Sequence, residues 1–429
     1  MDITPDTIRT TVDTLFDREV AFLTELVRHP SLRGAERSAQ DFIAEELGDC
    51  GFEVDRWEVR TEDIAGLPGY SAVEAPYTDA PNVVGALRSR TRTGRSLILN
   101  GHVDVVPTGP LDMWAHDPFA PEVSGDWLSG RGGGDMKAGL ASNLFALEAL
   151  RMLGQRPAAD VFYQSVVEEE CTGNGALACL QRGYRADAAL ISEPFSEHLV
   201  SAQVGVLWFQ VHLRGRPTHV AYAGSGANAI EAAFPLVAAL HELEADRNAP
   251  ERRHSEFADA EHALNLNIGK IVGGDWASSV PAWCSFDARM GLFPGEDLAE
   301  LKAAIEETIR VAAAAHPFLA NSLPEITYFG FAAEGYALAD DARPTTRAAE
   351  VALRTAHQTA AGAELELEAI TATTDARFFG LYADTPALVY GPKAESIHGF
   401  DERVDLESVR RVTQTTALFI ADWCGLEGI

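Results

Sequence analysis

The stretch SLILNGHVD at residues 96–104 decides the class of fold, because a short apolar strand runs directly into His102. The same arrangement occurs twice more. The stretch DVFYQSVVEEE at 160–170 ends in three glutamates, and AALISEP at 188–194 ends at Glu193 and a proline. Segments with helical spacing separate these strands. Such alternation predicts an α/β domain with a mostly parallel sheet.

Side chains that can bind a metal stand at the ends of several of these strands. In an open α/β sheet, ligands bind at the carboxyl ends of the strands, so side chains far apart in sequence are expected to meet there. Nitrogen and oxygen donors of this kind suit zinc, with cobalt or manganese as substitutes. The candidates are His102, Glu170, Glu193 and, beyond a further strand at 387–390, His398.

A glycine-rich run, GRGGGDMK at 130–137, contributes a further carboxylate, Asp135. Glycines let the backbone turn sharply before the helix expected at 136–153. A carboxylate here can bridge two metal ions, and two ions can hold both the carbonyl oxygen and the attacking water of a hydrolysis. The run lacks the Gly-Lys-Ser/Thr ending of a phosphate-binding loop, so a nucleotide site is not expected.

The glutamates at 168–170 form an unusual run of acids. Runs of like charge usually form a solvated surface, but this one follows the apolar residues 166–167 of a strand expected to be buried. Three acids there are costly without cations to meet them. One glutamate can bind a metal while a neighbour acts as general base, and spacing alone does not say which. Asp104, two residues after His102, matches the usual arrangement in which a carboxylate orients a metal-binding imidazole.

The middle of the chain indicates a separate module. Its order of strand, helix, strand, strand and helix resembles a small ferredoxin-like α+β unit. We therefore expect a catalytic domain in two parts, residues 1–202 and 333–429, with the module inserted at 203–332. The expected elements of the module are strands at 204–213, 264–272 and 283–292 and helices at 228–246 and 296–315.

The composition restricts the partners and the location of the protein. The chain has 34 lysines and arginines against 64 aspartates and glutamates, a formal net charge of −30. So acidic a protein is not expected to bind nucleic acid or an anionic membrane. No stretch approaches the ~18 unbroken apolar residues of a membrane helix, and the first residues lack the layout of a signal peptide. The five scattered cysteines form no disulfide framework, so the expected location is the cytoplasm.

Taken together, the motifs resemble those of a zinc deacylase and exopeptidase family. That family contains acetylornithine deacetylase, succinyl-diaminopimelate desuccinylase, aminoacylase and glutamate carboxypeptidase. The motifs follow the family's order and span nearly the whole chain. Where the family usually has Asp-Glu-Glu, this chain has three glutamates, which leaves the last two carboxylates in place. The motifs are GHVDVVP at 101–107, GRGGGDMK at 130–137, EEECTG at 168–173, SEP at 192–194 and IHG at 397–399.

The resemblance implies a site with two zinc ions and one general acid/base. In that site Asp135 would bridge the two ions. The other implied assignments are His102 and Glu193 to one ion, Glu170 and His398 to the other, Glu169 as the general acid/base, and Asp104 as the group that holds His102.

The resemblance extends to the inserted module, which in the family forms a lid and often pairs two subunits. RPTH at 216–219 is similar to a family segment whose histidine stabilises the oxyanion, commonly from the partner subunit. This implies that role for His219 and a homodimer formed through the lid. Arg289 and Arg377 are similar to arginines that bind the substrate, and guanidinium groups suit carboxylates. Either arginine can equally form a structural ion pair.

The function implied by the resemblance is a metal-dependent amidohydrolase that deacylates a small N-acyl amino acid, such as acetylornithine or a succinyl-diaminopimelate-like compound. The motifs do not exclude a dipeptidase or carboxypeptidase, or a deformylase of an N-formyl amine, because all of these place the same amide carbonyl on the metals. An inactive metal-binding protein is a further alternative, although no ligand or base is missing from the motifs.

Overall fold

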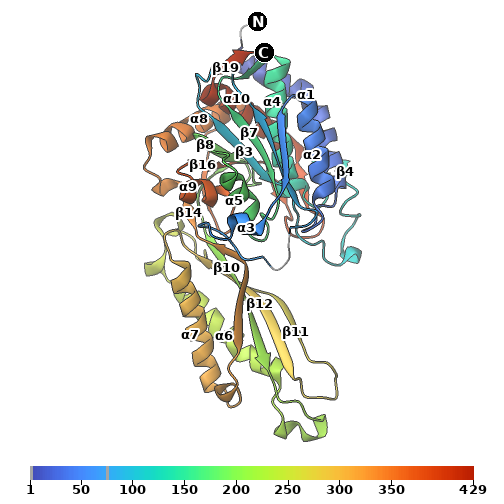
Figure 1. Cartoon of the computed structure of the whole chain (residues 1–429), viewed down its shortest axis with the longest axis vertical. Coiled ribbons are helices and arrows are strands. Elements are labelled where there is room, and N and C mark those ends of the chain that lie inside the picture. The colour runs from blue at the N-terminus through green and yellow to red at the C-terminus, as the bar shows by residue number, and fades with distance from the viewer. Residues whose placement is uncertain (1–2, 74–76) are drawn as a thin grey trace.

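The computed structural model describes residues 3–73 and 77–429. A large α/β unit contains the N-terminal and C-terminal segments, and an elongated smaller unit is formed by the middle of the chain (Figure 1). None of the helices in the described residues is both long enough and apolar enough to cross a membrane.

A six-stranded mixed sheet forms the centre of the large unit. Its strands are β1 (Glu53–Glu58), β2 (Pro81–Leu87), β3 (Leu97–His102), β7 (Val161–Val166), β8 (Ala188–Ile191) and β16 (Ala387–Val389). They lie in the order β1-β2-β7-β3-β8-β16. The four strands from β7 to β16 are parallel, and β2 and β1 extend the sheet in antiparallel fashion. The predicted α/β class with a mostly parallel sheet is confirmed.

Helices lie on both faces of this sheet (Figure 1). They are α1 (Pro5–Arg28), α2 (Arg37–Asp49), α3 (Thr61–Ile64), α4 (Ala138–Met152), α5 (Asn174–Gln181), α8 (Pro344–Ala361), α9 (Ala376–Tyr382) and α10 (Leu406–Cys424). Helix α4 packs against α1 and α10, and α10 also packs against α8. Every residue of α4 from Ala138 to Leu150 is buried, including the polar Ser142, Asn143 and Glu148, so this helix is surrounded by the rest of the large unit.

Three short sheets complete the large unit. One is β14-β9-β15, a second is β17-β18-β5-β4, and the third pairs β19 with β6. The second sheet connects the glycine-rich run before α4 with the loop that follows β16. The strands of these three sheets are β4 (Glu122–Ser124), β5 (Trp127–Ser129), β6 (Gln155–Pro157), β9 (Leu199–Gln203), β14 (Tyr336–Ala337), β15 (Leu367–Ile370), β17 (Ala394–Glu395), β18 (Arg403–Asp405) and β19 (Leu426–Gly428).

The smaller unit is an antiparallel sheet with two helices on one face. Its elements are β10 (Gly205–Arg214), α6 (Ala229–Arg247), β11 (Leu266–Gly273), β12 (Trp283–Leu292), α7 (Leu298–Ala315) and β13 (Glu325–Ala333). The strands lie in the order β11-β12-β10-β13, and the unit has a hydrophobic core of its own between sheet and helices. The structure therefore has the expected ferredoxin-like elements and adds β13, whereas the boundaries at 203 and 332 stay a prediction.

The sequence pattern does not predict β13, the fourth strand of the smaller unit, and the position of this strand explains why. Strand β13 lies at an edge of the sheet, six of its nine residues are exposed or only partly buried, and its register against β10 shifts at an irregularity. An edge strand of this kind lacks the regular alternation that identifies a half-buried strand.

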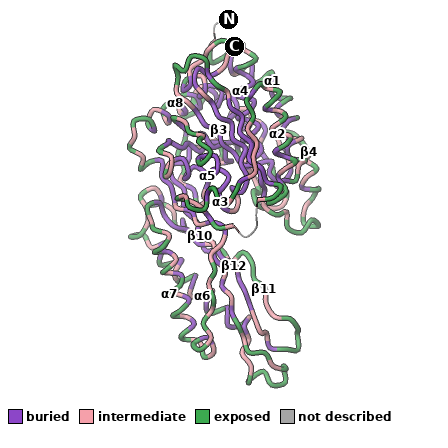
Figure 2. The backbone as a smooth tube through the Cα atoms, in the orientation of Figure 1, coloured by how far each residue is buried: buried purple, intermediate pink, exposed green. Residues whose placement is uncertain are grey.

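Figure 2 shows that the buried residues concentrate in the central sheet and α4 of the large unit.

Candidate metal centre

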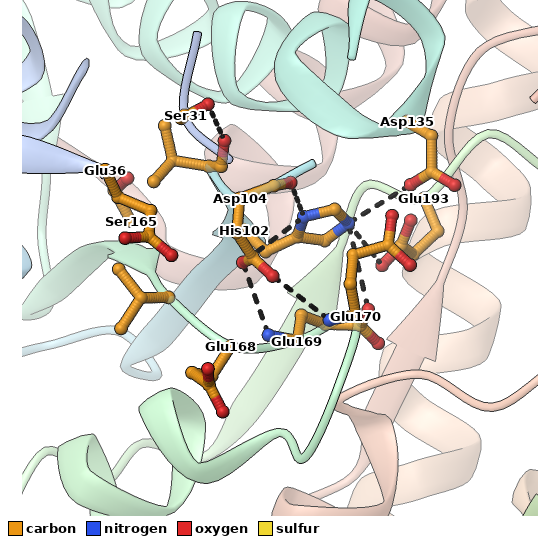
Figure 3. Close-up of polar contacts among 12 residues, drawn as sticks. Ser31, Glu36, His102, Asp104, Asp135, Ser165, Glu168, Glu169, Glu170 and Glu193 are labelled. Atoms are coloured by element: carbon orange, nitrogen blue, oxygen red, sulfur yellow. Dashed lines mark hydrogen bonds and ion pairs between the residues drawn. The ribbon is translucent and has the colours of Figure 1, made fainter. Parts of the chain in front are cut away.

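Six side chains that can bind a metal or move a proton meet at the carboxyl ends of the parallel strands. Figure 3 shows five of them, and His398 joins the group through contacts with Asp135 and Glu170. The structure thus brings together all the residues that the sequence singled out as ligands and base. They are His102 at the end of β3, Asp135 in the turn before α4, Glu169 and Glu170 after β7, Glu193 after β8 and His398 in the loop after β16.

Asp135 lies between the two imidazoles. Its Oδ1 is 3.1 Å from His102 Nε2, and its Oδ2 is 3.3 Å from His398 Nε2. Glu170 Oε2 lies 3.0 Å from His398 Nε2, whereas Glu193 Oε1 lies 3.7 Å from His102 Nε2. A carboxylate that turns one oxygen towards each of two imidazoles has the arrangement of a bridge between two cations.

The charges of this cluster favour bound cations. Burial alone would lower the pKa of His102, but Glu193 and Asp135 raise that pKa well above its ordinary value. Burial likewise opposes the proton on His398, but hydrogen bonds with Asp135 and Glu170 raise its pKa to about 11. Carboxylates held this close are stabilised by positive charge between them, from protons or from metal ions. Imidazole and carboxylate donors in this number fit two divalent ions of the zinc type.

Asp104 contacts both His102 and the residues that follow β7 (Figure 3). Its backbone carbonyl oxygen lies 2.9 Å from His102 Nδ1, whereas its carboxylate Oδ1 is 3.7 Å from that nitrogen. The carboxylate accepts the backbone N–H groups of Glu169 and Glu170, each at 3.2 Å. The reason is that Val103 N–H donates to Val166 O, which prolongs the pairing of β3 with β7 and sets Asp104 beside the residues that follow β7. The carbonyl therefore orients His102, and the carboxylate, which also faces that imidazole, orients the segment at 168–173, called here the glutamate loop.

Comparison with known proteins gives the family of this chain. Residues 98–422 match the sequence pattern of peptidase family M20/M25/M40. The chain belongs to this family. The predicted family is confirmed, and the M20 chain is a metal-dependent hydrolase that acts on amide bonds.

Curated relatives and solved structures resemble the M20 chain along almost its whole length. It is 29% identical over 416 residues to N-formyl-4-amino-5-aminomethyl-2-methylpyrimidine deformylase of Bacillus subtilis (strain 168), covering 92% of this chain and 91% of the relative. It is 28% identical over 405 residues to succinyl-diaminopimelate desuccinylase of Methylocella silvestris, covering 91% and 94%. A di-peptidase from Saccharomyces cerevisiae has the same fold, with a TM-score of 0.78, 16% identity and 99% of both chains covered.

Glu168, the position at which the M20 chain departs from the usual Asp-Glu-Glu, anchors the loop that carries Glu169. Arg33 pairs with the Glu168 carboxylate through Nε and Nη2, the latter at 3.2 Å. Thr172 Oγ1 donates to the same carboxylate at 3.0 Å. Glu168 and Glu169 are both buried, so the run is not a solvated surface. Arg33 belongs to no motif, and only the three-dimensional contact shows its role.

His219 is the one predicted catalytic residue that lies apart from the cluster. Strand β10 leads away from the large unit (Figure 1), and His219 follows the end of that strand in the connection to α6. Its side chain is exposed, and its Nδ1 accepts the backbone N–H of Ala221 at 3.1 Å. Within the described residues, no hydrogen bond or ion pair joins His219 to the metal-centre cluster. His219 is therefore not part of the metal-centre cluster within one chain of this structure.

The two candidate substrate arginines differ in their surroundings. Arg289 on β12 is paired across the strands with Trp208. Its Nε and Nη2 are buried and have no hydrogen-bond partner among the described residues, and burial lowers its pKa. Arg377 at the start of α9 is fully buried, and its Nη2 donates to Thr172 O at 2.7 Å. Arg377 is thus tied to the glutamate loop, although its buried Nη1 also has no hydrogen-bond partner among the described residues, whereas Arg289 has two such donor atoms.

Proposed function

We propose that the chain removes an acyl group from a small N-acylated amine or amino acid by attack of water at a centre of two zinc ions. The observation that carries the proposal is the placement of Asp135 between the two imidazoles, with Glu169 buried at the same edge of the sheet. The donor set suits zinc, with cobalt or manganese as substitutes.

The proposed ligand assignment is the one that the resemblance to the family implies, because Glu169 and Glu193 approach His102 Nε2 at similar distances, 3.9 and 3.7 Å. His102 and Glu193 would hold one ion, Glu170 and His398 would hold the other, and Asp135 would be shared by both. The contact of His398 with Glu170 and the approach of Glu193 to His102 support this division. When bound, the ions would polarise the amide carbonyl and activate a water molecule.

Glu169 is the proposed general acid and base. Its Oε2 lies 3.9 Å from His102 Nε2, and its backbone is fixed by Asp104. From this position Glu169 takes a proton from the attacking water and delivers that proton to the nitrogen of the leaving amine.

The relatives support removal of an acyl group rather than cleavage of a peptide. A formyl-pyrimidine deformylase and a succinyl-diaminopimelate desuccinylase both match nine-tenths of this chain. The free donors of Arg289 support a substrate with a carboxylate, because a guanidinium binds a carboxylate in bidentate fashion. We therefore place N-acyl amino acids first. Deformylation of an N-formyl amine is the second candidate, supported by the deformylase relative.

A panel of substrates tests this proposal. Amine release would be measured on formyl-, acetyl- and succinyl-amino acids, on N-formyl amines without a carboxylate, and on dipeptides. We expect turnover of one acyl class of amino acid, and we expect Arg289→Met to raise KM for that class with little change in kcat. Turnover of formyl amines that is unaffected by Arg289→Met selects the second candidate, and turnover of dipeptides alone contradicts deacylation.

We further propose that His219 stabilises the oxyanion in the active site of a partner subunit, within a homodimer formed through the smaller unit. Its exposed side chain supports the proposal, because His219 follows β10, the strand that leads away from the large unit (Figure 1), and has no contact with the cluster within the described residues. His219→Ala is expected to lower kcat by about 10²–10³-fold, the usual cost of losing one oxyanion donor, while the metal content stays unchanged.

Co-expression of two defective chains tests whether His219 acts across the dimer. In a mixed dimer of His219→Ala and Glu169→Gln chains, one active site has both an intact Glu169 and an intact His219 from the partner. We expect such a mixture to exceed the sum of the separate activities. Activity equal to that sum, or loss of metal from His219→Ala, would refute this role.

The substrate is proposed to be a small molecule, and neither nucleic acid nor a membrane is proposed as a partner, in keeping with the net charge of −30. We place the enzyme in the cytoplasm. All five cysteines lie in the described part of the chain and are free thiols there, which supports a reducing compartment.

A further inference from the structure

We infer that a buried ion pair between Arg131 and Glu402 is the positioning device that sets Asp135 and His398 at the right separation for two metal ions. Both residues are about as buried as side chains can be, at 1% exposure each. Neither belongs to the proposed ligand set. The inference rests on the proposed two-metal centre, and it concerns how the fold holds that centre together.

Glu402 holds the segment that carries Asp135. Its Oε1 accepts the backbone N–H of Gly134 at 3.0 Å and that of Asp135 itself at 3.1 Å. Its backbone carbonyl accepts the N–H of Gly130 at 2.9 Å. One residue from the C-terminal part of the chain therefore fixes both ends of the glycine-rich run. Because glycines impose few conformational limits of their own, this run needs such an external partner to keep one conformation.

Arg131 joins the same network to the loop that carries His398. Its Nη1 donates to Glu402 Oε2 at 2.6 Å, and its Nη2 donates to the carbonyl oxygen of Gly399 at 2.9 Å. The guanidinium also lies over the ring of Trp114, 5.1 Å from the ring centre. A guanidinium can direct separate N–H groups at two acceptors in fixed directions, which a lysine ammonium does less well.

The loop around His398 depends on this support more than the segment around His102 does. His102 ends a parallel strand whose pairing with β7 continues through Val103. His398 has a left-handed backbone, with φ of 61°, and half of its side chain is exposed. A residue other than glycine is rarely stable in that conformation unless its neighbours hold it there. Gly399, which follows directly, is the residue that Arg131 holds.

The direction of these bonds argues against a purely stabilising role. A buried ion pair contributes little to stability on average, because desolvation offsets the attraction between the charges. Here the remaining hydrogen bonds of both partners go to the backbone of ligand-bearing segments. Mutation of residues that hydrogen-bond to metal ligands, without binding the metal themselves, typically lowers metal affinity or activity by about 10–100-fold.

Glu402→Gln and Arg131→Lys test the inference by metal binding rather than by activity. Glutamine keeps the shape of Glu402 but removes its charge. Lysine keeps the charge of Arg131 but cannot direct two N–H groups at separate acceptors as the planar guanidinium does. Chelator-stripped protein would be titrated with zinc against a competing chromophoric chelator. We expect each variant to bind the ion assigned to Glu170 and His398 about 10–100-fold more weakly, and to weaken the other ion less, because the two ions share only Asp135. His398→Ala serves as the reference for loss of the same ion.

A matched control comes from a second ion pair away from the metal centre, in which Arg182 donates two hydrogen bonds to the Asp55 carboxylate. Asp55→Asn removes that charge and should leave both zinc affinities unchanged. Melting of the metal-free proteins identifies any variant that has lost its fold, and either one of the two variants suffices for the test. Two ions bound with wild-type affinity in a folded Glu402→Gln or Arg131→Lys chain would overturn the inference. A wild-type chain that binds fewer than two ions contradicts the proposed metal centre itself, which is a different result.

Discussion

Glu169→Gln is expected to reduce kcat by about 10²–10⁴-fold, the range for loss of a positioned general acid or base. Glutamine has nearly the same shape, but its amide cannot take a proton from the attacking water. Glu169 is buried at 6% exposure, and its backbone is held by Asp104, so bulk buffer has little access to replace it. The measurement is steady-state amine release by the variant and the wild-type chain at equal metal content.

The metal content separates loss of the base from loss of the site. Glu169 is not among the proposed ligands, so the variant should retain the wild-type number of ions and the wild-type melting temperature. Near-normal turnover in a metal-loaded Glu169→Gln chain would show that another group moves the proton. Loss of metal would instead make Glu169 a ligand, and one of the assigned ligands would then need a different role.

Asp135→Ala is expected to remove both ions and to reduce amine release to the background rate. The two oxygens of Asp135 face different imidazoles, at 3.1 and 3.3 Å, so its loss withdraws a ligand from each proposed ion at once. His398→Ala is the matched comparison, since it withdraws a ligand from one ion only. Metal content after dialysis would be compared for the wild type and the two variants.

The order of metal loss decides the outcome of that comparison. The proposed arrangement requires fewer ions in Asp135→Ala than in His398→Ala, and fewer in His398→Ala than in the wild type. Equal metal loss in the two variants would mean that Asp135 serves one ion and is not a bridge. Two ions retained in Asp135→Ala would remove this residue from the centre.

The sequence predicted the features of this protein that depend on short segments and on the order of strands and helices. Apolar strands that end in His102 or Glu193 could be recognised by eye, and parallel strands bring their carboxyl ends to one edge of a sheet. The α/β class and the family followed from those patterns, and both are confirmed. The six side chains of the candidate centre meet where that reasoning placed them.

The sequence pattern did not predict the residues that hold the metal ligands in place. Arg33 reaches Glu168 across 135 positions of sequence, and Arg131 reaches Glu402 across 271, and no spacing rule links positions so far apart. Asp104 was expected to hold His102, and its oxygens do lie beside that imidazole, but spacing gave no sign that its carboxylate also accepts the backbone N–H groups of Glu169 and Glu170.

The most direct test of the central claim is the number of metal ions bound per chain, measured together with amine release before and after chelation. We predict two zinc ions per chain, amine release that stops when a chelator removes them, and recovery when zinc is restored. A chain that turns over an N-acyl amino acid at full rate with no bound metal would contradict the account.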